Sequence, residues 1–362
     1  MEHRKLGSFS EMKYGRMPDK KKLLDKGEYP VFSGYRIVGY YDECNIDKQE
    51  LIVVARGVGG TGDVKLSPGA CFLTNLSIAV IVDESIALKE YLYYYFQINN
   101  LRYLDSGSAQ SQITIADLKN VVVPIPSLDQ QRKVVEILRR YDEKIEVNNK
   151  INDNLQQQAM ALYASMFLDN PALETTAGTL KDIADITMGQ SPSGSSYNED
   201  GNGEVFYQGR AEFGYRFPTR RLFTTEPKRM AEAGDVLLSV RAPVGDLNVA
   251  YERCCIGRGL GAIHGRNGYQ SFVLYTMFAL RPQLDVYNGE GTVFGSINRN
   301  ALNDMPIDIP SEDAIAAFEA VVRPMDNMIR TNYEENCRLQ ELRDALLPRL
   351  MSGEVDVSDI DI

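Results

Sequence analysis

Residues 127–167 read SLDQQRKVVEILRRYDEKIEVNNKINDNLQQQAMALYASMF, and the rest of the chain is arranged around this segment. Positions separated by alternating steps of four and three form a single stripe along it. That spacing is the seam of a coiled coil, because about 3.5 residues per repeat keep one stripe facing a partner helix. The stripe consists of Val134, Leu138, Tyr141, Ile145, Asn148, Asn152, Leu155, Ala159, Leu162 and Met166. The segment therefore predicts a long helix that packs on a second helix.

The same stripe returns 184 residues later, within the segment SEDAIAAFEAVVRPMDNMIRTNYEENCRLQELRDALLPRLM at residues 311–351. Its positions are Phe318, Val322, Met325, Ile329, Asn332, Asn336, Leu339, Arg343, Leu346 and Leu350. Both copies carry two asparagines in the middle of the stripe. One such stripe could belong to an ordinary long helix on a globular core, but two copies in the same register indicate a helix pair.

The connection between the two stripes predicts that the helices are antiparallel. Residues 171–310 suffice for one domain, and the two ends of a domain usually lie close together, so the second helix should begin where the first one ends. Asn148 would then face Asn336, and Asn152 would face Asn332. Buried asparagine pairs lower stability but fix the register of a coiled coil. We therefore assign these four residues to helix register.

Start and stop signals divide the chain. Prolines precede both long helices, Ser127 and Gln130 form a capping box, and Ser311 caps the second helix. The expected parts are a globular domain at 1–126, a long helix at 127–170, a globular domain at 171–310, a long helix at 311–352 and an acidic tail at 353–362. Pro348 predicts a kink or early fraying near the end of the second helix.

The two globular segments also repeat one another. Leu51–Arg56 parallels Val236–Arg241, and each is an apolar run, typical of a strand, that ends in an arginine before a turn. Further matches are Leu6–Pro18 with Leu180–Pro192, Tyr29–Gly34 with Glu204–Gly209, Leu88–Gln97 with Ser271–Leu280, and Gln112–Thr114 with Ser296–Asn298. We expect an α+β fold in which two similar mixed α/β domains are joined by two long antiparallel coiled-coil helices with pseudo-twofold symmetry.

Composition limits the classes of protein to consider. Five cysteines without a C-x-x-C pair and only two histidines argue against a zinc site. Cys254 and Cys255 are adjacent in an apolar run, which favours buried thiols in a reducing compartment. The first residues lead into no apolar run, and no stretch is long enough to cross a membrane, so we expect a cytoplasmic protein without signal peptide or membrane span.

The net charge of −11 is unevenly distributed. Residues 1–126 carry 15 basic and 15 acidic groups, and residues 171–310 carry 13 and 16. Residues 311–362 carry 5 basic and 12 acidic groups, so most of the excess lies on the second helix and the tail. The near-neutral globular parts can present basic patches, and composition therefore does not exclude a nucleic-acid partner.

Two motifs that suggest small-molecule or base binding favour structural explanations. Residues 57–62 match G-x-G-x-x-G after a strand, but a second strand follows instead of the helix that would hold a pyrophosphate. We interpret them as a tight loop. The tyrosine-rich segment at residues 91–96 points in all directions on a helix and is more typical of core residues. No catalytic motif is recognisable.

The duplicated order of motifs resembles a known family. Strands that end in an arginine, the segment Tyr29–Gly34, a Pro-Ile-Pro-Ser sequence before a long helix and the ending LLPRLMSGE at 346–354 are similar to the specificity subunit of type I restriction–modification systems. The resemblance covers essentially the whole chain. It implies that residues 1–126 and 171–310 are target recognition domains, each reading one half of a split double-stranded DNA site, while the helices set the spacer.

The resemblance also implies partners and cofactors. Two methyltransferase subunits would dock along the helices, bind S-adenosylmethionine and methylate adenine at N6, and restriction subunits would cut DNA with ATP and Mg²⁺. The chain itself would be a non-catalytic subunit without a bound cofactor or metal. Ile137 and Ile151 lie beside or off the helix seam, so we expect them to contact the methyltransferase subunits.

Candidate DNA-binding residues are polar side chains in the loops that differ between the two repeats. Arginine pairs with guanine, and glutamine or asparagine pairs with adenine, through two hydrogen bonds. The candidates in the first domain are Arg36, Arg56, Asn75, Gln110 and Gln112. Those in the second domain are Gln190, Gln208, Arg210, Arg241, Arg258 and Asn298. Each of them could instead serve only loop hydrogen bonding.

Two other classes of function stay open on the sequence. A coiled-coil scaffold or adaptor protein would show no salt-dependent affinity for DNA, even with its partners present. A nucleotide enzyme built on the glycine loop would be stabilised by its ligand. The ordered, twice-repeated motifs favour the DNA-specificity subunit over both.

Overall fold

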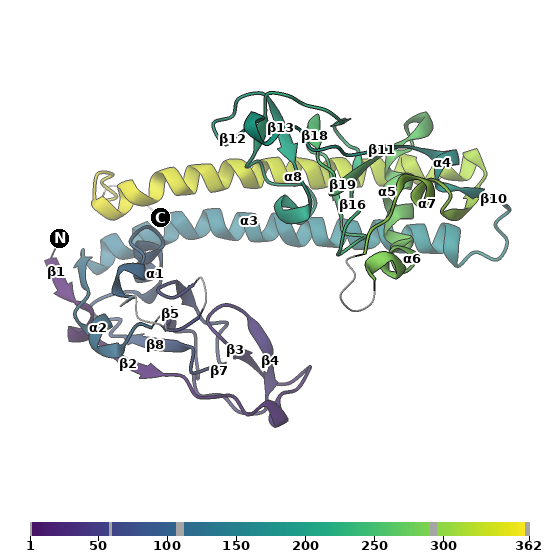
Figure 1. Ribbon diagram of the computed structural model, residues 1–362. Helices are drawn as coiled ribbons and strands as arrows, with labels where there is room; N and C mark the ends of the chain where they lie inside the picture. The colour runs from purple at the N-terminus through teal and green to yellow at the C-terminus, as the bar shows by residue number, and fades with distance from the viewer. Residues whose placement is uncertain (1, 58–59, 106–111, 290–294, 359–362) are drawn as a thin grey trace. The chain divides into compact units, whose positions relative to one another are not determined.

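The computed structural model describes the chain except for residues 1, 58–59, 106–111, 290–294 and 359–362. Contacts divide the protein into two compact units, which are described one at a time. Unit 1 comprises Met1–Val147 and Glu335–Ile362, and unit 2 comprises Asn148–Glu334. Each unit contains a sheet-rich domain and one part of each of two long helices (Figure 1).

The long helices are α3 (Leu128–Tyr163) and α8 (Glu312–Ser352), with 36 and 41 residues. At about 1.5 Å per residue they are roughly 54 and 62 Å long. The predicted capping box is present, because the Gln130 N–H donates to Ser127 Oγ and the Ser127 N–H donates to Gln130 Oε1, both at 3.3 Å. These bonds satisfy two donors that a helix start leaves without partners.

The expected early fraying at Pro348 is wrong, because α8 continues through it to Ser352. Leu347, Leu350 and Met351 are buried in the core of unit 1, and this packing outweighs the hydrogen bond that the proline cannot donate. The irregular end belongs to the first helix instead. There, Ala164–Leu168 form a single stretch of π-helix.

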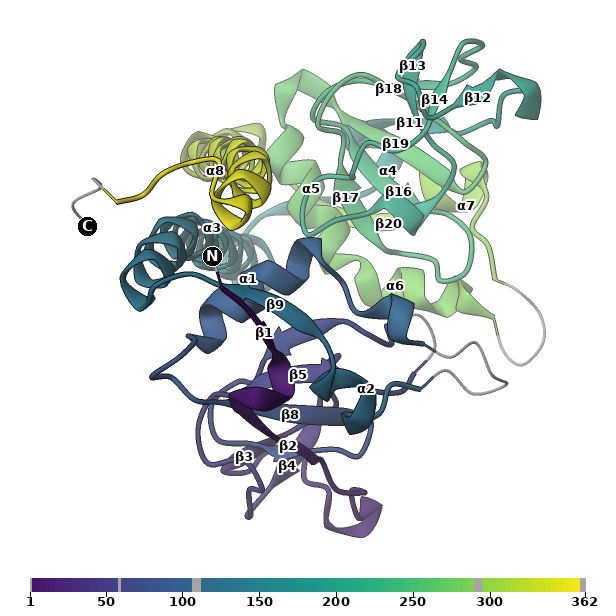
Figure 2. The same cartoon turned by 90° about the vertical axis from the view of Figure 1, so that its left-hand side faces the viewer.

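The two long helices pack in opposite directions in each unit. In unit 1, Val134 of α3 shares a core with Leu350 of α8. In unit 2, Tyr163 of α3 packs on Phe318 of α8, with ring centroids 5.6 Å apart. Later residues of α3 thus meet earlier residues of α8, and Figures 1 and 2 show the two helices side by side. This is the predicted antiparallel pair.

The four central asparagines of the helix stripes are buried. In unit 2, Asn332 Nδ2 donates to Asn152 Oδ1 at 2.8 Å. Asn148 and Asn336 are buried as well. An amide pair inside an apolar seam is satisfied only when the two side chains lie level with each other, so a shifted register would leave them without partners.

Unit 1 contains a four-stranded antiparallel sheet in the order β2-β8-β5-β6 and a smaller sheet in the order β4-β3-β7. In the smaller sheet β3 and β7 are parallel. The strands of unit 1 are β1 (Glu2–Lys5), β2 (Ser10–Tyr14), β3 (Tyr29–Phe32), β4 (Ile37–Tyr41), β5 (Leu51–Val54), β6 (Val64–Leu66), β7 (Phe72–Leu73), β8 (Ser77–Val82) and β9 (Val122–Ile125). Strand β1 pairs with β9 immediately before α3 begins. The short helices are α1 (Lys89–Ile98) and α2 (Ile115–Lys119).

Unit 2 repeats this plan. Its four-stranded sheet has the order β11-β19-β16-β17, β10 pairs with β20 immediately before α8, and β13 runs parallel to β18. The strands are β10 (Thr175–Thr179), β11 (Ala184–Met188), β12 (Tyr197–Asn198), β13 (Glu204–Tyr207), β14 (Phe223–Thr224), β15 (Met230–Ala231), β16 (Val236–Ser239), β17 (Leu247–Val249), β18 (Cys254–Ile256), β19 (Leu260–Gly265) and β20 (Pro306–Pro310). The short helices are α4 (Leu180–Ile183), α5 (Gln270–Ala279), α6 (Arg281–Asp285) and α7 (Arg299–Asn303). The repeat predicted from the sequence is therefore a structural one.

One helix of each domain, α1 or α5, lies between the main sheet and the long helices, and a side chain of a long helix caps its start. In unit 1, Gln131 Oε1 of α3 accepts the Leu88 N–H at 2.8 Å. In unit 2, the Glu319 carboxylate of α8 accepts the Ser271 and Phe272 N–H groups at 3.2 and 3.0 Å. Acceptors at a helix start satisfy donors that would otherwise stay unpaired in the core. The caps thus fasten each domain to the helix that passes it.

The chain after α8 turns back onto unit 1. Val357 is buried in the core of that unit, and Lys133 Nζ donates to the Ser358 carbonyl at 2.7 Å. Together, two similar mixed α/β domains and two long antiparallel helices are the predicted fold class, which is confirmed. No helix in the described part of the chain is both long and apolar enough to cross a membrane.

Candidate nucleic-acid interface

Four strands of unit 1, β2, β3, β5 and β7, end along one rim of the domain. Backbone hydrogen bonds join the loops that follow them. The Arg16 N–H donates to the Leu73 carbonyl at 3.0 Å, which ties the loop after β2 to β7. The Arg56 N–H donates to the Leu76 carbonyl at 3.1 Å, which ties the loop after β5 to the start of β8. We call this set rim 1. It comprises residues 15–16, 33–36, 55–57, 74–76 and 112–113.

Rim 1 collects the candidates predicted for the first domain. Arg36 and Arg56 are exposed, and Asn75 and Gln112 are partly exposed. Arg56 forms a β-bridge with Gln112, so these two candidates are neighbours. The remaining candidate, Gln110, lies outside the described residues. The arrangement brings residues that are up to 76 positions apart onto one surface.

Unit 2 has the same arrangement. The Gln190 N–H donates to the Ile256 carbonyl at 3.0 Å, and the Val240 N–H donates to the Gly259 carbonyl at 3.0 Å. Arg241 forms a β-bridge with Ser296, as Arg56 does with Gln112. We call this set rim 2. It comprises residues 189–191, 208–210, 240–242, 257–259 and 296–297.

Rim 2 collects most of the candidates predicted for the second domain, and Gln190, Gln208, Arg241 and Arg258 are all exposed. The parallel pairing of β3 with β7, and of β13 with β18, makes Asn75 and Arg258 equivalent, since each follows its strand by two residues. Several equivalent positions of the two rims therefore carry different side chains. Among the polar positions, Arg16 corresponds to Gln190, Asn75 to Arg258 and Gln112 to Ser296 in this comparison, whereas Arg56 and Arg241 are both arginine.

Close backbone contact at each rim requires a glycine. A Cβ atom on Gly15 would lie 2.1 Å from the Thr74 carbonyl oxygen, and one on Gly189 would lie 2.1 Å from the Gly257 carbonyl oxygen. No side chain fits at such a distance, so glycine lets the first loop lie directly on the strand end beside it. The same requirement for glycine thus applies at both rims, although the sequences around the two glycines differ.

Two of the predicted candidates are already engaged within unit 2. The Arg210 guanidinium forms an ion pair with Asp246 at 2.5 Å. The Asn298 side chain accepts the Ala301 N–H at 2.9 Å and so caps α7, as Thr114 caps α2 in unit 1. Asn298 thus has the structural role of a helix cap, and its position directly before a short helix was the signal for it.

Four other rim arginines have no partner for their side chains among the residues that the structure describes. Arg36, Arg56, Arg241 and Arg258 are exposed, and none of their guanidinium groups makes a hydrogen bond or ion pair with a residue that the structure describes. Elsewhere in unit 2, Arg220 pairs with Glu252. Within each unit, the unpaired guanidinium groups of its rim are suited to phosphates and to base edges.

Sequence reasoning missed one residue of rim 1. Arg16 is exposed beside Asn75, whose N–H donates to the Arg16 carbonyl at 2.9 Å. Its guanidinium likewise contacts no residue in the described part of the chain through an ion pair. The internal repeat was the available signal, because Arg16 aligns with the predicted candidate Gln190.

The glycine-rich segment of unit 1 is a hairpin loop between the antiparallel strands β5 and β6, as predicted. Gly62 has a φ of +93°, and a Cβ atom there would lie 2.6 Å from the backbone nitrogen of Arg102. No helix start follows to hold a pyrophosphate. Within the described ranges there is also no group of three or more His, Cys, Asp or Glu residues that could hold a metal ion.

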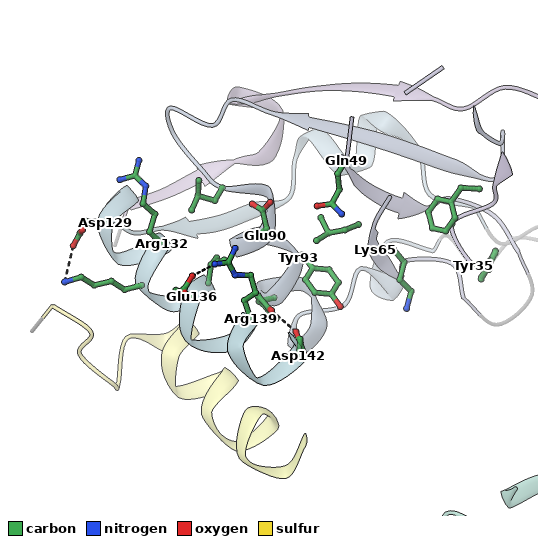
Figure 3. Close-up of a pocket in the computed structure, with 17 residues that line it drawn as sticks. Tyr35, Gln49, Lys65, Glu90, Tyr93, Asp129, Arg132, Glu136, Arg139 and Asp142 are labelled. Atoms are coloured by element: carbon green, nitrogen blue, oxygen red, sulfur yellow. Dashed lines mark hydrogen bonds and ion pairs between the residues drawn. The ribbon is translucent and has the colours of Figure 1, made fainter. Parts of the chain in front are cut away.

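A groove of about 1220 Å³ runs in unit 1 between the sheet domain and α3 (Figure 3). Arg132, Glu136 and Arg139 project into it from α3, and Arg139 pairs with Glu136. Two residues that line the groove are joined by a hydrogen bond of 2.7 Å, which the Tyr94 hydroxyl donates to Asp142. Burial and this hydrogen bond both raise the pKa of Tyr94, so the hydroxyl stays a donor. One end of the groove is lined by Tyr35 of rim 1.

The two residues expected to contact a partner differ in exposure. Ile137 is partly buried against the core of unit 1, whereas Ile151 is 42% exposed. Val147, four residues before Ile151 on α3, is also exposed. Two apolar side chains at this spacing lie on the same face of a helix, and an exposed apolar face is a candidate for protein contact.

Comparison with known proteins agrees with this architecture. A family model described as "Type I restriction modification DNA specificity domain" matches residues 1–157. A Methanocaldococcus jannaschii protein assigned as the type I restriction enzyme MjaX specificity subunit is 30% identical over 294 residues, which cover 76% of this chain and 69% of that protein. The type I restriction enzyme MjaIX specificity subunit of the same organism is 21% identical over 361 residues, covering 88% and 81%. A crystal structure of a type I restriction–modification S subunit from M. genitalium has the same fold, with a TM-score of 0.61 at 19% identity over 96% of this chain and 95% of that one.

Proposed function

We propose that this chain, which belongs to the family of type I restriction–modification specificity subunits, selects the DNA sequence on which a methyltransferase and restriction complex acts. Rim 1 reads one half of a bipartite site in double-stranded DNA, and rim 2 reads the other half. The chain contributes recognition and geometry, and the chemistry belongs to its partner subunits.

One observation carries this proposal. Both rims present an exposed arginine without an ion-pair partner in the described part of the chain at the same place, Arg56 and Arg241, surrounded by positions that differ. A shared arginine provides the same mode of contact in both halves, while different neighbours provide different sequence preferences. Two similar but non-identical readers suit a site whose halves differ in sequence.

The long helices serve two further purposes in this proposal. They fix the spacing between the two readers, with Asn148, Asn152, Asn332 and Asn336 holding the helix register. They also dock two methyltransferase subunits, which bind S-adenosylmethionine and methylate adenine. Restriction subunits that use ATP and Mg²⁺ join the same assembly.

We assign the methyltransferase contact to the face of α3 that carries Val147 and Ile151, with Ile137 as a partly buried neighbour. The groove of unit 1 leads from α3 to Tyr35 in rim 1. A partner seated on α3 could therefore extend along the groove to the DNA at that rim. This arrangement would place a catalytic subunit beside the half-site that the rim reads.

The test uses the complex of this chain with its methyltransferase subunits, and it maps methylated adenines for Arg56→Ala and Arg241→Ala. Each loss of a base contact should cost about 1–3 kcal/mol at one base pair and relax the preference there. Arg56→Ala should change only one half of the recognised motif, and Arg241→Ala only the other half.

Lys26→Ala serves as the control, since Lys26 is exposed and lies outside rim 1. Equal weakening at all sites, with a salt dependence reduced by about one unit, would instead identify the arginines as phosphate contacts. Unchanged affinity and unchanged motif in both variants, at normal folded yield, would contradict DNA contact at the rims.

A further inference from the structure

Tyr35 of rim 1 lies on the glycine-rich hairpin loop of unit 1. A Cβ atom on Gly57 would lie 2.1 Å from the Tyr35 hydroxyl oxygen, and one on Gly60 would lie 2.2 Å from its ring. The hydroxyl group donates a hydrogen bond to the Arg56 carbonyl at 3.1 Å. The two glycines therefore make room for an aromatic ring, which explains a pattern that otherwise suggests phosphate binding.

The hydrogen bond from Tyr35 means that both backbone polar groups of Arg56, the N–H and the carbonyl, are held. Its N–H already donates to the Leu76 carbonyl, and the Tyr35 hydroxyl adds a donor to its carbonyl. Burial, and the nearby Asp63 carboxylate, raise the pKa of Tyr35, so the hydroxyl keeps its proton at neutral pH. The arginine thus extends from a fixed point, and its guanidinium group pairs with no residue in the described ranges.

Tyr35 is itself held in place by the turn that carries it. The Ser33 N–H donates to the Arg36 carbonyl at 3.1 Å, and Ser77 Oγ donates to the Ser33 carbonyl at 2.9 Å. The same turn carries Arg36, the neighbouring candidate for DNA contact. Tyr35 therefore connects the two segments of rim 1 that present arginines.

Arg210 occupies the equivalent position in unit 2, directly after Gly209, as Tyr35 follows Gly34. It pairs with Asp246 at 2.5 Å, and Asp246 lies in the hairpin loop between β16 and β17 that carries Arg241. Arg281 holds the other oxygen of the same carboxylate at 2.9 Å. The hairpin is closed by the Ser239 N–H, which donates to the Asp246 carbonyl at 2.8 Å.

The geometry points to one positioning device with two chemistries: Tyr35 and Arg210 fasten the hairpins that present Arg56 and Arg241, and neither reads a base itself. This inference rests on the proposed DNA-reading function. It removes Arg210 from the base-reading candidates, and it adds Tyr35 as a residue that controls specificity through another side chain.

The physical reason is the cost of ordering a long side chain. Arginine discriminates between bases through two parallel hydrogen bonds, which require its backbone to be placed accurately. A hairpin loop without a second anchor would have to be ordered at the moment of binding, and that entropy would reduce discrimination. Preorganisation through a neighbouring loop avoids this loss.

The test in unit 1 is a double-mutant cycle in the methyltransferase complex. The variants are Tyr35→Phe, which removes only the hydroxyl, Arg56→Ala and the double variant. We measure the ratio of methylation rates on the preferred half-site and on the half-site substituted at the Arg56-dependent base pair. Tyr35→Phe should lower this ratio about tenfold, but less than about twofold when Arg56→Ala is already present.

Tyr29→Phe is the matched control, because it removes a hydroxyl at the start of β3, whereas Tyr35 lies in the turn after the end of that strand. It should leave the ratio unchanged. A Tyr35→Phe effect that adds fully to that of Arg56→Ala, or that falls on a different base pair, would mean that Tyr35 contacts DNA itself. A lowered melting temperature with unchanged ratios would mean that it only stabilises the fold. Either result overturns the inference.

Unit 2 allows a sharper test of whether Arg210 fastens the hairpin or reads a base. Replacing Asp246, its ion-pair partner, has opposite consequences for these two roles. If Arg210 fastens the hairpin, Asp246→Ala, which also removes the Arg281 contact, should relax the second half-site at least as much as Arg210→Ala does. The double variant should then match Asp246→Ala. If Arg210 reads a base, Asp246→Ala would free its guanidinium and leave discrimination intact or improved. Asp246→Asn, which keeps one acceptor oxygen, replaces Asp246→Ala where folded yield is low.

The outcome also separates this inference from the proposed function. Sequence-specific methylation by the wild type and by Tyr29→Phe, with no loss in Tyr35→Phe and in Asp246→Ala, would refute the positioning role and leave the function standing. Absence of any sequence preference in the wild-type complex would refute the function on which the inference rests.

Discussion

Arginines of this protein fall into two groups according to what their guanidinium groups touch. Arg36, Arg56, Arg241 and Arg258 meet no charged partner in the part of the chain that the structure describes, whereas Arg216 is buried against the Asp326 carboxylate. The first group is available to a ligand. The second holds a domain together, and its energetic cost can be measured independently of any DNA.

The buried pair gives the prediction at the residue scale. Arg216 is only 4% exposed, its guanidinium also donates to Gln156 Oε1 at 3.1 Å, and the Tyr275 hydroxyl donates to Asp326 at 3.0 Å. Arg216→Met would leave the Asp326 carboxylate buried without its cation. We expect a loss of about 3–5 kcal/mol in the free energy of unfolding, measured by urea denaturation at pH 7.

This loss should depend on pH with a definite sign. Burial raises the pKa of Asp326, and removing Arg216 removes an interaction that lowers it, so the pKa in the variant should rise further. A raised carboxyl pKa in the folded state gives stability that is present at low pH and is lost as pH rises through it. The deficit of Arg216→Met should therefore shrink between pH 7 and pH 5. A constant deficit would contradict a buried uncompensated charge as its cause.

The same scale shows what could be read from the sequence. Arg56 and Arg241 were predicted because a strand end followed by a turn places a side chain at a sheet edge, which is a local property. The engagement of Arg210 could not be predicted, since its partner Asp246 lies 36 residues away and is brought near only by the fold. Arg16 was missed although the internal repeat aligned it with Gln190.

At the scale of elements, the two long helices are the parts that the sequence predicted best. Their seam, antiparallel direction and capping box follow from local spacing and from the length of the intervening domain. The caps that Gln131 and Glu319 provide to the domains could not be derived in this way. Each depends on which face of a long helix a domain covers, and that is decided by packing.

The exposed face of α3 gives the prediction at this scale. Ile151→Asp places a charge on the face assigned to the methyltransferase, and burying that charge would be unfavourable. We expect the dissociation constant for the methyltransferase subunit to rise at least about tenfold, or about 1.4 kcal/mol. Size-exclusion chromatography and titration calorimetry would measure it.

Gln157→Asp is the matched control, since Gln157 is exposed on the same helix but is not apolar. Circular dichroism of both variants would verify that α3 is intact. Ile151 is the better test residue than Ile137, because Ile137 also packs on the core of unit 1 and its substitution would disturb folding. Full binding by Ile151→Asp would show that the docking face lies elsewhere.

At the scale of the whole molecule, one chain carries two readers, and we propose that a helix pair sets their spacing. The internal repeat is visible in the strand order, in the β-bridges of Arg56 and Arg241, and in the glycines that let the rim loops touch. The two repeats share architecture and differ in the side chains they present. That combination is what a bipartite site with unlike halves requires.

The most direct measurement of this claim lengthens both helices and maps the methylated sites. Four residues are inserted after Ile145 in α3 and four after Arg338 in the facing stretch of α8, where the Lys144–Glu335 ion pair of 3.1 Å marks the contact. The insertion adds about 6 Å and a rotation of about 40°, which a coiled coil can absorb locally. At about 3.4 Å per base pair, both half-site sequences should stay the same while the spacer between them grows by one or two base pairs. An active complex with an unchanged spacer would contradict the account.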